Sequence, residues 1–324
     1  DLLWQYNHRL AKGVGPTIKR SIAIAGSRLY VATSDTHMVA LDVKTGKVLW
    51  DHVVADQKAG YGITGGPLVV GNRVIVGPLG RAPGGNVIVG LDAQTGSEAW
   101  KFHVIPQPGQ PGDNTWNATP LEKRNGGSVW IPPSYDVAHN LVFLAPGNTY
   151  DTAPLRNLVK QPGITNDGLY LDTTLAISPN DGRLAWYFQH QANGQWDLDW
   201  AFERQIMQLP VNGRTETVVL TAGKQMIYDL VEAETLGPSA SHQGGRGVKD
   251  SLAPGAAPPR SGVRGRRRGR RRDGVPGLWG FGTQGRNPCH LAGTGGAVDV
   301  GSGGVDMSLS ARTLTLYLND CSVR

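Results

Sequence analysis

The feature that most constrains the fold of this chain is a ten-residue repeat with a turn at its centre. Residues 41–50 read LDVKTGKVLW and residues 91–100 read LDAQTGSEAW, so Leu, Asp, Thr, Gly and Trp recur at a spacing of 50 residues. A degraded third copy spans residues 177–186 and again ends in Trp. Residues 135–140 look like a copy without the Trp, and residues 232–235 look like the start of another. One structural unit is therefore used several times.

The central Asp-x-x-Thr-Gly is turn chemistry, because Asp accepts hydrogen bonds from the backbone just after it and Gly tolerates a positive φ. Apolar segments that read as strands precede the turn, such as residues 28–33 and 74–77, and a further strand ends in the Trp. Units of roughly 40 to 55 residues built from short strands are typical of four-stranded β-propeller blades. We predict an all-β propeller in which each Trp packs between neighbouring blades.

The repeat stops near residue 237, which divides the chain into three parts. Residues 1–237 carry the propeller pattern, residues 238–307 are rich in Gly, Pro and Arg, and residues 308–324 regain a strand-like alternation at TLTLYL (313–318). The composition of the middle part predicts disorder. The run GRRRGRRR (265–272) also suggests a coding sequence read in a shifted frame, which would explain why the pattern is lost and then returns.

The positive charge of the chain belongs to the same middle part. The formal net charge is +6, but eight arginines lie between Arg260 and Arg272, and without them it is −2. Such a run could neutralise the phosphates of a nucleic acid. No aromatic residues are interleaved with it, so we expect no nucleic-acid partner. No apolar stretch of about 18 residues occurs either, so we expect no transmembrane segment.

Four motifs outside the repeat carry a family resemblance. They are GGSVW (126–130), APGN (145–148), QWDLD (195–199) and TAGKQ (221–225). In this order, and together with the repeat, they resemble the alcohol and methanol dehydrogenases that depend on pyrroloquinoline quinone (PQQ). The resemblance covers about residues 3–235. Because that family consists of eight-bladed quinoprotein propellers, it implies four to five recognisable blades and PQQ as the cofactor.

The resemblance assigns cofactor-binding roles to four residues. Trp130 matches the Trp that forms the floor under the quinone ring, and a flat indole suits a flat tricyclic ligand. Thr64 and Ser128 match hydroxyl positions that hold the carboxylates of the cofactor. Lys224 matches the cation beside the quinone oxygen, where it would stabilise the charge that develops on reduction.

The resemblance also assigns a catalytic base and metal ligands. Asp197 matches the general base that takes the proton of the alcohol. Lys224 is the second catalytic residue that the resemblance implies, through its positive charge beside the quinone oxygen. Asn148 and Asp197 match ligands of the active-site metal, which is Ca²⁺ in many members. Asp199 lies two residues on, hence on the same face if the segment is extended. Lanthanide-dependent relatives carry a second Asp at this offset, so Asp199 points to Ca²⁺ or a lanthanide.

The chain departs from the family at one expected metal ligand. The family places a Glu just after the strand equivalent to residues 74–77, where this chain reads GPLGRAPGG (77–85) without an acid. A site for a hard cation therefore lacks one anionic ligand at this position.

Two functions fit these observations. The first is the oxidation of an alcohol to an aldehyde or ketone, with hydride passing to PQQ and electrons going on to a c-type cytochrome in the periplasm. The second is a non-catalytic propeller scaffold of the outer-membrane-assembly type, which needs no cofactor or metal. A scaffold has no use for Trp130, Asn148, Asp197 and Lys224, so their joint presence favours the enzyme.

Overall fold

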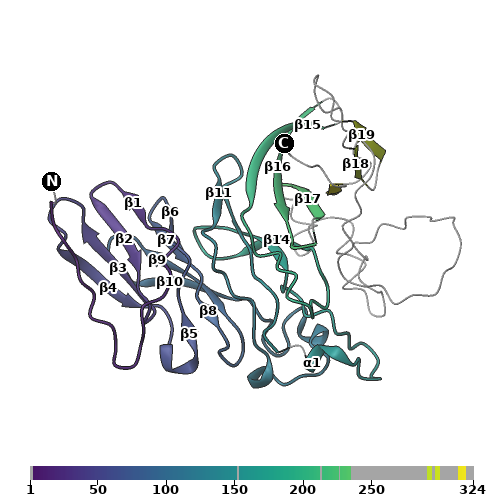
Figure 1. Cartoon of the computed structure of the whole chain (residues 1–324), viewed down its shortest axis with the longest axis horizontal. Coiled ribbons are helices and arrows are strands. Elements are labelled where there is room, and N and C mark those ends of the chain that lie inside the picture. The colour runs from purple at the N-terminus through teal and green to yellow at the C-terminus, as the bar shows by residue number, and fades with distance from the viewer. Residues whose placement is uncertain are drawn as a thin grey trace, which may run out of the picture.

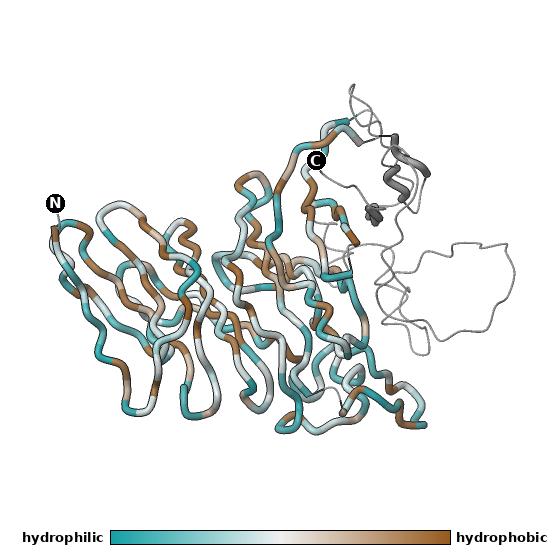
Figure 2. Tube along the Cα trace, in the orientation of Figure 1, coloured by the Kyte–Doolittle hydropathy of each residue, from teal (hydrophilic) through white to brown (hydrophobic). Residues whose placement is uncertain are grey.

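The structure is a computed structural model that describes residues 3–151, 153–211, 214–225 and 227–234, and three short strands beyond them. Four antiparallel sheets follow one another as an arc in chain order (Figure 1). Apolar stretches fall mainly within these sheets, and the loops that connect the strands are mostly polar or neutral (Figure 2). The prediction of an all-β propeller with several blades is confirmed.

Each of the first three sheets has four strands, and we call them blades I, II and III. Blade I consists of β1 (Ala23–Ala25), β2 (Arg28–Ala32), β3 (His37–Asp42) and β4 (Val48–Val53). Blade II consists of β6 (Leu68–Val70), β7 (Arg73–Val76), β9 (Val87–Asp92) and β10 (Glu98–His103). Blade III consists of β11 (Ser134–Asp136), β12 (Leu141–Leu144), β13 (Thr173–Ile177) and β14 (Leu184–Gln189).

The fourth sheet, blade IV, begins with β15 (Gln205–Val211), β16 (Arg214–Ala222) and β17 (Ile227–Glu232). The strand expected at residues 313–318 is confirmed as β20 (Thr313–Leu318), which pairs antiparallel with β17. Strands β18 (His290–Gly293) and β19 (Gly296–Asp299) extend the same sheet. The remainder of residues 238–307 lies outside the described residues, so its predicted disorder or shifted frame stays a prediction.

Short elements between the blades complete the described part. Strands β5 (Tyr61–Gly62) and β8 (Leu79–Gly80) form a separate two-stranded ribbon. The helical turns are η1 (Gln57–Ala59), η2 (Asp113–Thr115), η3 (Leu121–Lys123) and α1 (Ala153–Arg156). None of the helices in the described residues is long or apolar enough to cross a membrane.

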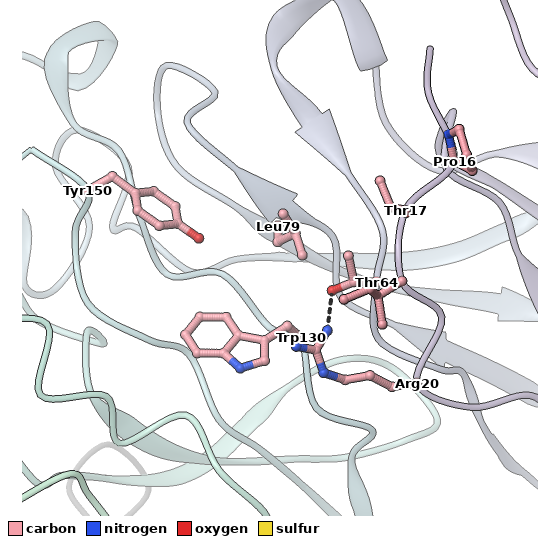
Figure 3. Close-up of a pocket in the computed structure, with 8 residues that line it drawn as sticks. Pro16, Thr17, Arg20, Thr64, Leu79, Trp130 and Tyr150 are labelled. Atoms are coloured by element: carbon pink, nitrogen blue, oxygen red, sulfur yellow. Dashed lines mark hydrogen bonds between the residues drawn. The ribbon is translucent and has the colours of Figure 1, made fainter.

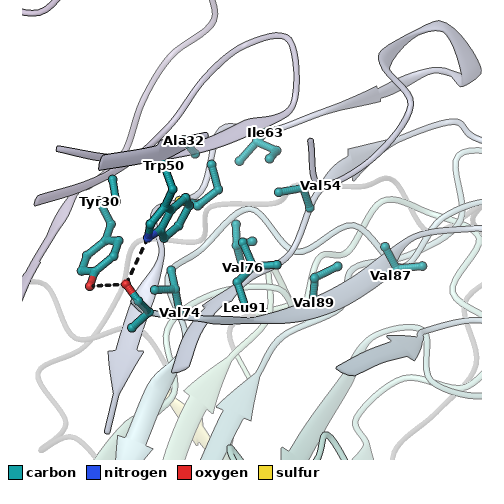
Figure 4. Packing of buried hydrophobic residues seen from close by; sticks show 13 residues of the cluster. Tyr30, Ala32, Trp50, Val54, Ile63, Val74, Val76, Val87, Val89 and Leu91 are labelled. Atoms are coloured by element: carbon teal, nitrogen blue, oxygen red, sulfur yellow. Dashed lines mark hydrogen bonds between the residues drawn. The ribbon is translucent and has the colours of Figure 1, made fainter. Parts of the chain in front are cut away.

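The Trp residues of the repeat join each blade to the next, as the sequence predicts. The indole Nε1 of Trp50 donates to Ala93 O in blade II at 3.1 Å, and Tyr30 donates to the same oxygen (Figure 4). Trp100 and Trp186 repeat this bond to the carbonyls of Pro179 and Ala233, at 2.9 and 3.4 Å. The same bond, at 2.8 Å, links Trp4 to Val43, the matching residue of blade I.

The glycine of each docking turn is required by this contact. A Cβ on Gly96 (φ +75°) would lie 2.7 Å from the ring of Trp50, and one on Gly182 (φ +71°) 2.5 Å from the ring of Trp100. Any side chain would therefore push the indole off the turn as well as strain the backbone. Asp92 shapes the turn, because its Oδ1 accepts hydrogen bonds from the backbone N–H groups of Gln94 and Thr95.

The partial copy at residues 135–140 is not a docking turn. It connects β11 to β12, the first two strands of blade III, whereas the docking turns of blades I, II and III connect the third strand to the fourth. Asp136 does stabilise a turn, because its Oδ1 accepts a hydrogen bond from Ala138 N. This turn, however, lies at a different place in the blade from the docking turns. The start of a copy at residues 232–235 is correct, because Ala233 receives the indole of Trp186.

Three clusters of buried apolar residues fill the spaces between consecutive blades. Figure 4 shows the first of them, in which Val54 and Ile63 of the segment leaving blade I meet Val76 and Val89 of blade II. The second joins blades II and III around Trp100, and the third joins blades III and IV around Trp186. Each interface therefore has a Trp at one end and aliphatic side chains along its length.

Replacing Trp100 by Ala is expected to lower the free energy of unfolding by about 3–5 kcal/mol, because it empties a buried position and breaks the bond to Pro179. Trp196→Ala is the matched control, since Trp196 is 80% exposed and its loss should cost within about 0.5 kcal/mol. Urea unfolding of both variants measures the difference. Equal losses in the two variants would contradict the docking role of Trp100.

Candidate active site

The predicted site residues occupy two equivalent places in the blades. One place is the segment just before the first strand of a blade, and it holds Thr64, Ser128, Trp130, Asp197 and Asp199. The other is the loop after the second strand, and it holds Asn148 and Lys224. Neighbouring strands run antiparallel, so both places lie at the same end of the sheets. The fold thus brings side chains from blades II, III and IV to one end of the propeller.

A pocket of about 540 Å³ opens at this end, next to Trp130. Its lining comes from the approach to blade I and from blades II and III: Pro16, Thr17, Ile18, Arg20, Thr64, Leu79, Trp130 and Tyr150. Figure 3 shows the indole of Trp130 beside the hydrogen-bonded pair of Arg20 and Thr64, with Tyr150 across the pocket from Pro16. A volume of this size is typical of a site for a small molecule or cofactor.

Thr64 is held by Arg20, a residue that our sequence reasoning did not select. The guanidinium Nη1 of Arg20 donates to Thr64 Oγ1 at 2.8 Å, and Arg20 N donates to Thr64 O at 3.0 Å. Arg20 lies just before the first strand of blade I, which is the place that Thr64 and Trp130 occupy in the next two blades. Comparing the blades strand by strand, rather than by their docking turns, would have identified it.

A second cation, Arg81, lies above the ring of Tyr150, with 5.5 Å between the guanidinium carbon and the ring centroid. Tyr150 in turn donates its hydroxyl to Ser128 Oγ at 2.8 Å. Arg20 thus lines the pocket itself, whereas Arg81 is linked to it only through the ring of Tyr150, and both guanidinium groups suit an anionic ligand. Neither Arg81 nor Tyr150 belongs to a motif that the sequence alone marks.

Ser128 is fully buried beneath the pocket and does not line it. Besides the hydroxyl of Tyr150, its Oγ accepts the backbone N–H of Gly80 and the side-chain amide of Asn86, each at 3.1 Å. The hydroxyl thus fixes Tyr150 and the β8 ribbon in place. Direct contact between Ser128 and a cofactor stays a prediction.

Trp130 and Asn148 are adjacent because of a glycine. A Cβ on Gly147 would lie 2.6 Å from the far edge of the Trp130 ring and 3.4 Å from the Cβ of Ala201. Gly147 thus allows the edge of the indole to approach the backbone that carries Asn148. Ala201, in the loop after Asp199, also lies next to Gly147. Asn148 itself is buried, and its amide donates to Thr149 O at 3.0 Å.

Asp197, Asp199 and Lys224 form one cluster. The Nζ of Lys224 lies 2.6 Å from Asp199 Oδ2 and 3.3 Å from Asp197 Oδ2, and it donates to Asp197 O at 3.0 Å. The expectation of an extended segment is wrong, because Asp197 and Asp199 have φ angles of +53° and +39°. Non-glycine residues with such angles are strained and cluster at functional sites. The ammonium, rather than strand geometry, brings the two carboxylates together.

Burial and charge set the protonation of this cluster. Burial raises the pKa of Asp199, and the negative charge of Asp197 adds to the increase, while Lys224 opposes it. Burial lowers the pKa of Lys224, but its contacts with Asp199 and Asp197 outweigh burial, so the pKa of Lys224 is raised. Lys224 is therefore a firmly positive group between two carboxylates.

The loop in which the family supplies a Glu carries no acid. In the loop after β7, where the family supplies a Glu, Ala82 is fully buried and Arg81 is exposed. Among the residues that the structure describes, no group of three or more Asp, Glu, His or Cys side chains could hold a metal ion.

The segment that carries Thr17 and Arg20 is anchored to blade I by Asp35. This buried carboxylate accepts hydrogen bonds from Thr33 Oγ1 (2.6 Å), Ala11 N (3.0 Å) and His8 Nε2 (3.0 Å). Burial raises the pKa of Asp35, but these hydrogen bonds outweigh it and lower the pKa to about 2. Asp35 occupies the loop after the second strand of blade I, so it matches Asn148 and Lys224 in position.

Comparison with known proteins agrees with this architecture. The sequence model described as the β-propeller domain of PQQ-containing glucose, ethanol and alcohol dehydrogenases matches residues 51–235. The quinohemoprotein alcohol dehydrogenase ADH IIB of Pseudomonas putida is 33% identical over 246 residues, which are 71% of this chain and 35% of that protein. The dehydrogenase subunit of the quinone alcohol dehydrogenase of Gluconacetobacter polyoxogenes is 30% identical over 72% of this chain and 35% of its own length.

Solved structures give the same result. The quinohemoprotein alcohol dehydrogenase ADHIIG of Pseudomonas putida HK5 superposes with a TM-score of 0.60 and 27% identity, over 67% of this chain and 33% of that one. A europium-containing methanol dehydrogenase gives a TM-score of 0.58 and 26% identity, over 66% and 39%.

The fold and the pocket define a quinoprotein-type β-propeller. The chain belongs to the PQQ-dependent alcohol dehydrogenase family, and it spans about a third of the length of the relatives that it matches.

The anchoring of the pocket wall predicts a pH-dependent effect of Asp35→Asn. The folded pKa of about 2 lies below the unfolded value of about 3.9, so the ionised carboxylate stabilises the fold above pH 4. The variant should lose about 2 kcal/mol at pH 7, and this deficit should shrink as the pH falls from 4 toward 2. Urea unfolding at several pH values checks this, with the exposed Glu122→Gln as control. A deficit that stays constant below pH 4 would contradict the assignment.

Proposed function

We propose that this chain forms the part of a PQQ-dependent alcohol dehydrogenase that binds the quinone and a hard cation, and that it oxidises alcohols to aldehydes or ketones. The observation that carries the proposal is a pocket beside Trp130 that lies at the same end of the sheets as Asn148 and the cluster of Asp197, Asp199 and Lys224. A scaffold protein has no need for either.

The residues of the pocket fit a flat, anionic cofactor. The half-buried indole of Trp130 offers an aromatic face on which a tricyclic quinone can lie. Arg20, oriented by Thr64, and Arg81, oriented by Tyr150, supply positive charge for the carboxylates of PQQ. Ser128 supports this arrangement through its bond with Tyr150.

The residues also fit a hard cation. Asp199 Oδ1 is buried and has no hydrogen-bond partner among the described residues, which is costly for a carboxylate unless a cation completes its environment. Asn148, Asp197 and Asp199 would hold Ca²⁺ or a lanthanide through oxygen atoms, the ligands that such ions prefer. The cation would polarise the alcohol oxygen and keep the carboxylates ionised.

In this proposal Asp197 is the general base. Its side chain is largely exposed, so an alcohol can reach it, and Lys224 holds it next to Asp199. Asp197 would remove the hydroxyl proton of the alcohol, and PQQ, when bound, would supply the acceptor for the hydride of the alcohol carbon. Lys224 keeps a positive charge where negative charge develops during reduction.

The names of the relatives also support a proposal for the electron acceptor and for the cellular compartment. A c-type cytochrome is the proposed acceptor, supported by relatives named quinohemoprotein alcohol dehydrogenases and by a relative named as a dehydrogenase subunit. We propose a periplasmic location on the same basis.

The proposal predicts that the purified 324-residue chain binds PQQ in the presence of Ca²⁺ or La³⁺. Binding should quench Trp fluorescence, and Trp130→Ala should weaken it by roughly 10–100-fold through loss of the stacking surface. A fluorescence titration measures both affinities, with Trp196→Ala as the matched control. If the wild type binds no PQQ with either ion, the result would contradict the enzyme proposal and favour the non-catalytic scaffold.

Catalysis is tested separately from binding. At saturating Ca²⁺, Asp197→Asn should lower dye-linked alcohol oxidation by roughly 10²–10⁴-fold while leaving the affinity for PQQ within about threefold, because it removes the base and one anionic ligand of the cation but none of the residues proposed to contact the quinone. Asp181→Asn, in an exposed turn of blade III, should leave both unchanged. Full turnover by Asp197→Asn would remove Asp197 from the proposed mechanism.

The second carboxylate predicts the choice of metal. Asp199→Ala should reduce La³⁺-supported oxidation more than Ca²⁺-supported oxidation, because an ion of higher charge gains more from an extra anionic ligand. Rates at saturating metal, compared for the wild type and the variant, measure this ratio. A wild type that works no better with La³⁺ than with Ca²⁺ would exclude a lanthanide role for Asp199.

A further inference from the structure

His190 is a fully buried side chain next to the proposed site to which the family resemblance assigns no role. It lies directly after β14 in blade III. The rings of His190 and Trp200 are stacked, with 4.5 Å between their centroids and an angle of 4° between their planes. Because Trp200 directly follows Asp199 in the sequence, only one side chain separates His190 from the loop that carries the proposed base.

The imidazole of His190 is held by a chain of hydrogen bonds that runs in one direction. The buried guanidinium of Arg204 can only donate, and its Nε donates to Thr174 Oγ1 at 2.9 Å. The Thr174 hydroxyl then donates its own proton to His190 Nε2 at 2.7 Å, and His190 Nδ1 donates to Asp229 Oδ2 at 2.6 Å. Burial lowers the pKa of His190, and Asp229 opposes this effect. The ring is thus a neutral group that is fixed at both nitrogens.

The indole of Trp200 is positioned by the packing of its ring. Its Nε1 is buried and has no hydrogen-bond partner among the described residues, although its backbone N–H donates to Asp172 Oδ1 at 3.2 Å. Besides His190, the ring contacts Gly223, where a Cβ would lie 2.7 Å from Cε2 of the indole. Gly223 directly precedes Lys224. The indole therefore reaches from His190 in blade III to the loop of Lys224 in blade IV.

The loop of residues 197–200 needs such an anchor because its backbone is strained. Asp197 and Asp199 have φ angles of +53° and +39°, which non-glycine residues keep only where the surrounding structure holds them. The backbone N–H of Lys224 donates to the carbonyl of Leu198 in this loop at 2.8 Å. This bond joins the two loops, whereas the stacked indole attaches them to blade III.

We propose that His190 is a positioning residue for alcohol oxidation and that it acts through the ring of Trp200. The inference rests on the proposed function, because it assumes that Asp197 removes a proton and that Lys224 supplies positive charge beside the quinone. A base must stay within hydrogen-bonding reach of its proton, and a displacement of about 1 Å can cost on the order of 10²-fold in rate. His190 contacts no substrate, but it holds the loop of Asp197 in place relative to Lys224.

Amide hydrogen exchange of the full chain, without cofactor or metal, tests this anchor. His190→Asn keeps a donor for Asp229 but removes the ring that stacks on Trp200. We expect the amides of residues 195–200 to exchange roughly 10-fold faster than in the wild type, because the strained loop opens more often. Tyr30→Phe removes a buried hydrogen bond in blade I and should leave exchange of this loop unchanged. Unchanged exchange of residues 195–200 in His190→Asn would overturn the inference.

Three further variants separate stacking from a general loss of stability. Gly223→Ala leaves His190 and its hydrogen bonds in place but brings a methyl group against the indole, so it should speed exchange of the same loop. Trp200→Phe keeps an aromatic ring on His190 and should protect the loop better than Trp200→Leu. Equal exchange in the Phe and Leu variants would show that stacking does not hold the loop.

Kinetics of the loaded enzyme test the consequence for catalysis. With saturating PQQ and Ca²⁺, His190→Asn should lower kcat per bound PQQ roughly 10–100-fold, while the KM for the alcohol and the affinity for PQQ change by at most about threefold. An unchanged kcat per bound PQQ would overturn the inference and leave the proposed function standing. If the wild type oxidises no alcohol although His190→Asn speeds exchange of the loop, the proposed function fails, and the catalytic role of His190 fails with it.

Discussion

The interaction on which the rest of the structure depends is the hydrogen bond from the indole N–H of each docking tryptophan to a turn carbonyl of the next blade. Trp4, Trp50, Trp100 and Trp186 make it in succession, so every described blade is fixed to its neighbour at one outer corner. The docking glycine lets the ring lie flat on the turn, and aliphatic side chains fill the remaining interface. Because a buried donor needs an acceptor, this hydrogen bond fixes how two neighbouring blades are placed, which non-directional apolar contact alone would not do.

That placement is what turns separate loops into a site. Three predicted site residues precede the first strands of three different blades: Thr64, Trp130 and Asp199. Since no single sheet holds all three, their arrangement depends on how the blades are docked. Behind Asp199, the ring of Trp200 stacks on His190 with 4.5 Å between ring centroids, and His190 is held between Asp229 and Thr174 at 2.6 and 2.7 Å. This buried hydrogen-bonded chain connects blades III and IV next to the loop that carries Asp197 and Asp199.

The sequence predicts the fold well and the site unevenly. The Asp-x-x-Thr-Gly turn and its Trp carry local chemistry that can be read without coordinates, and they identify the blades. Arg20 could not be found in this way, because its place in the pocket depends on its contact with Thr64, which is far away in sequence. The extended geometry expected at Asp197 and Asp199 failed because both residues adopt positive φ angles to meet Lys224.

The loss of an acid in the loop after β7 has to be weighed against the surroundings of the cluster. Asp197 and Asp199 bring two carboxylates, and the ammonium of Lys224 lies within 3.3 Å of both. Lys224 leaves Asp199 Oδ1 buried and without a hydrogen-bond partner among the described residues. A hard ion takes several oxygen ligands at once, whereas an ammonium has three donors. In the proposed function, this oxygen is therefore the one that a bound cation would satisfy.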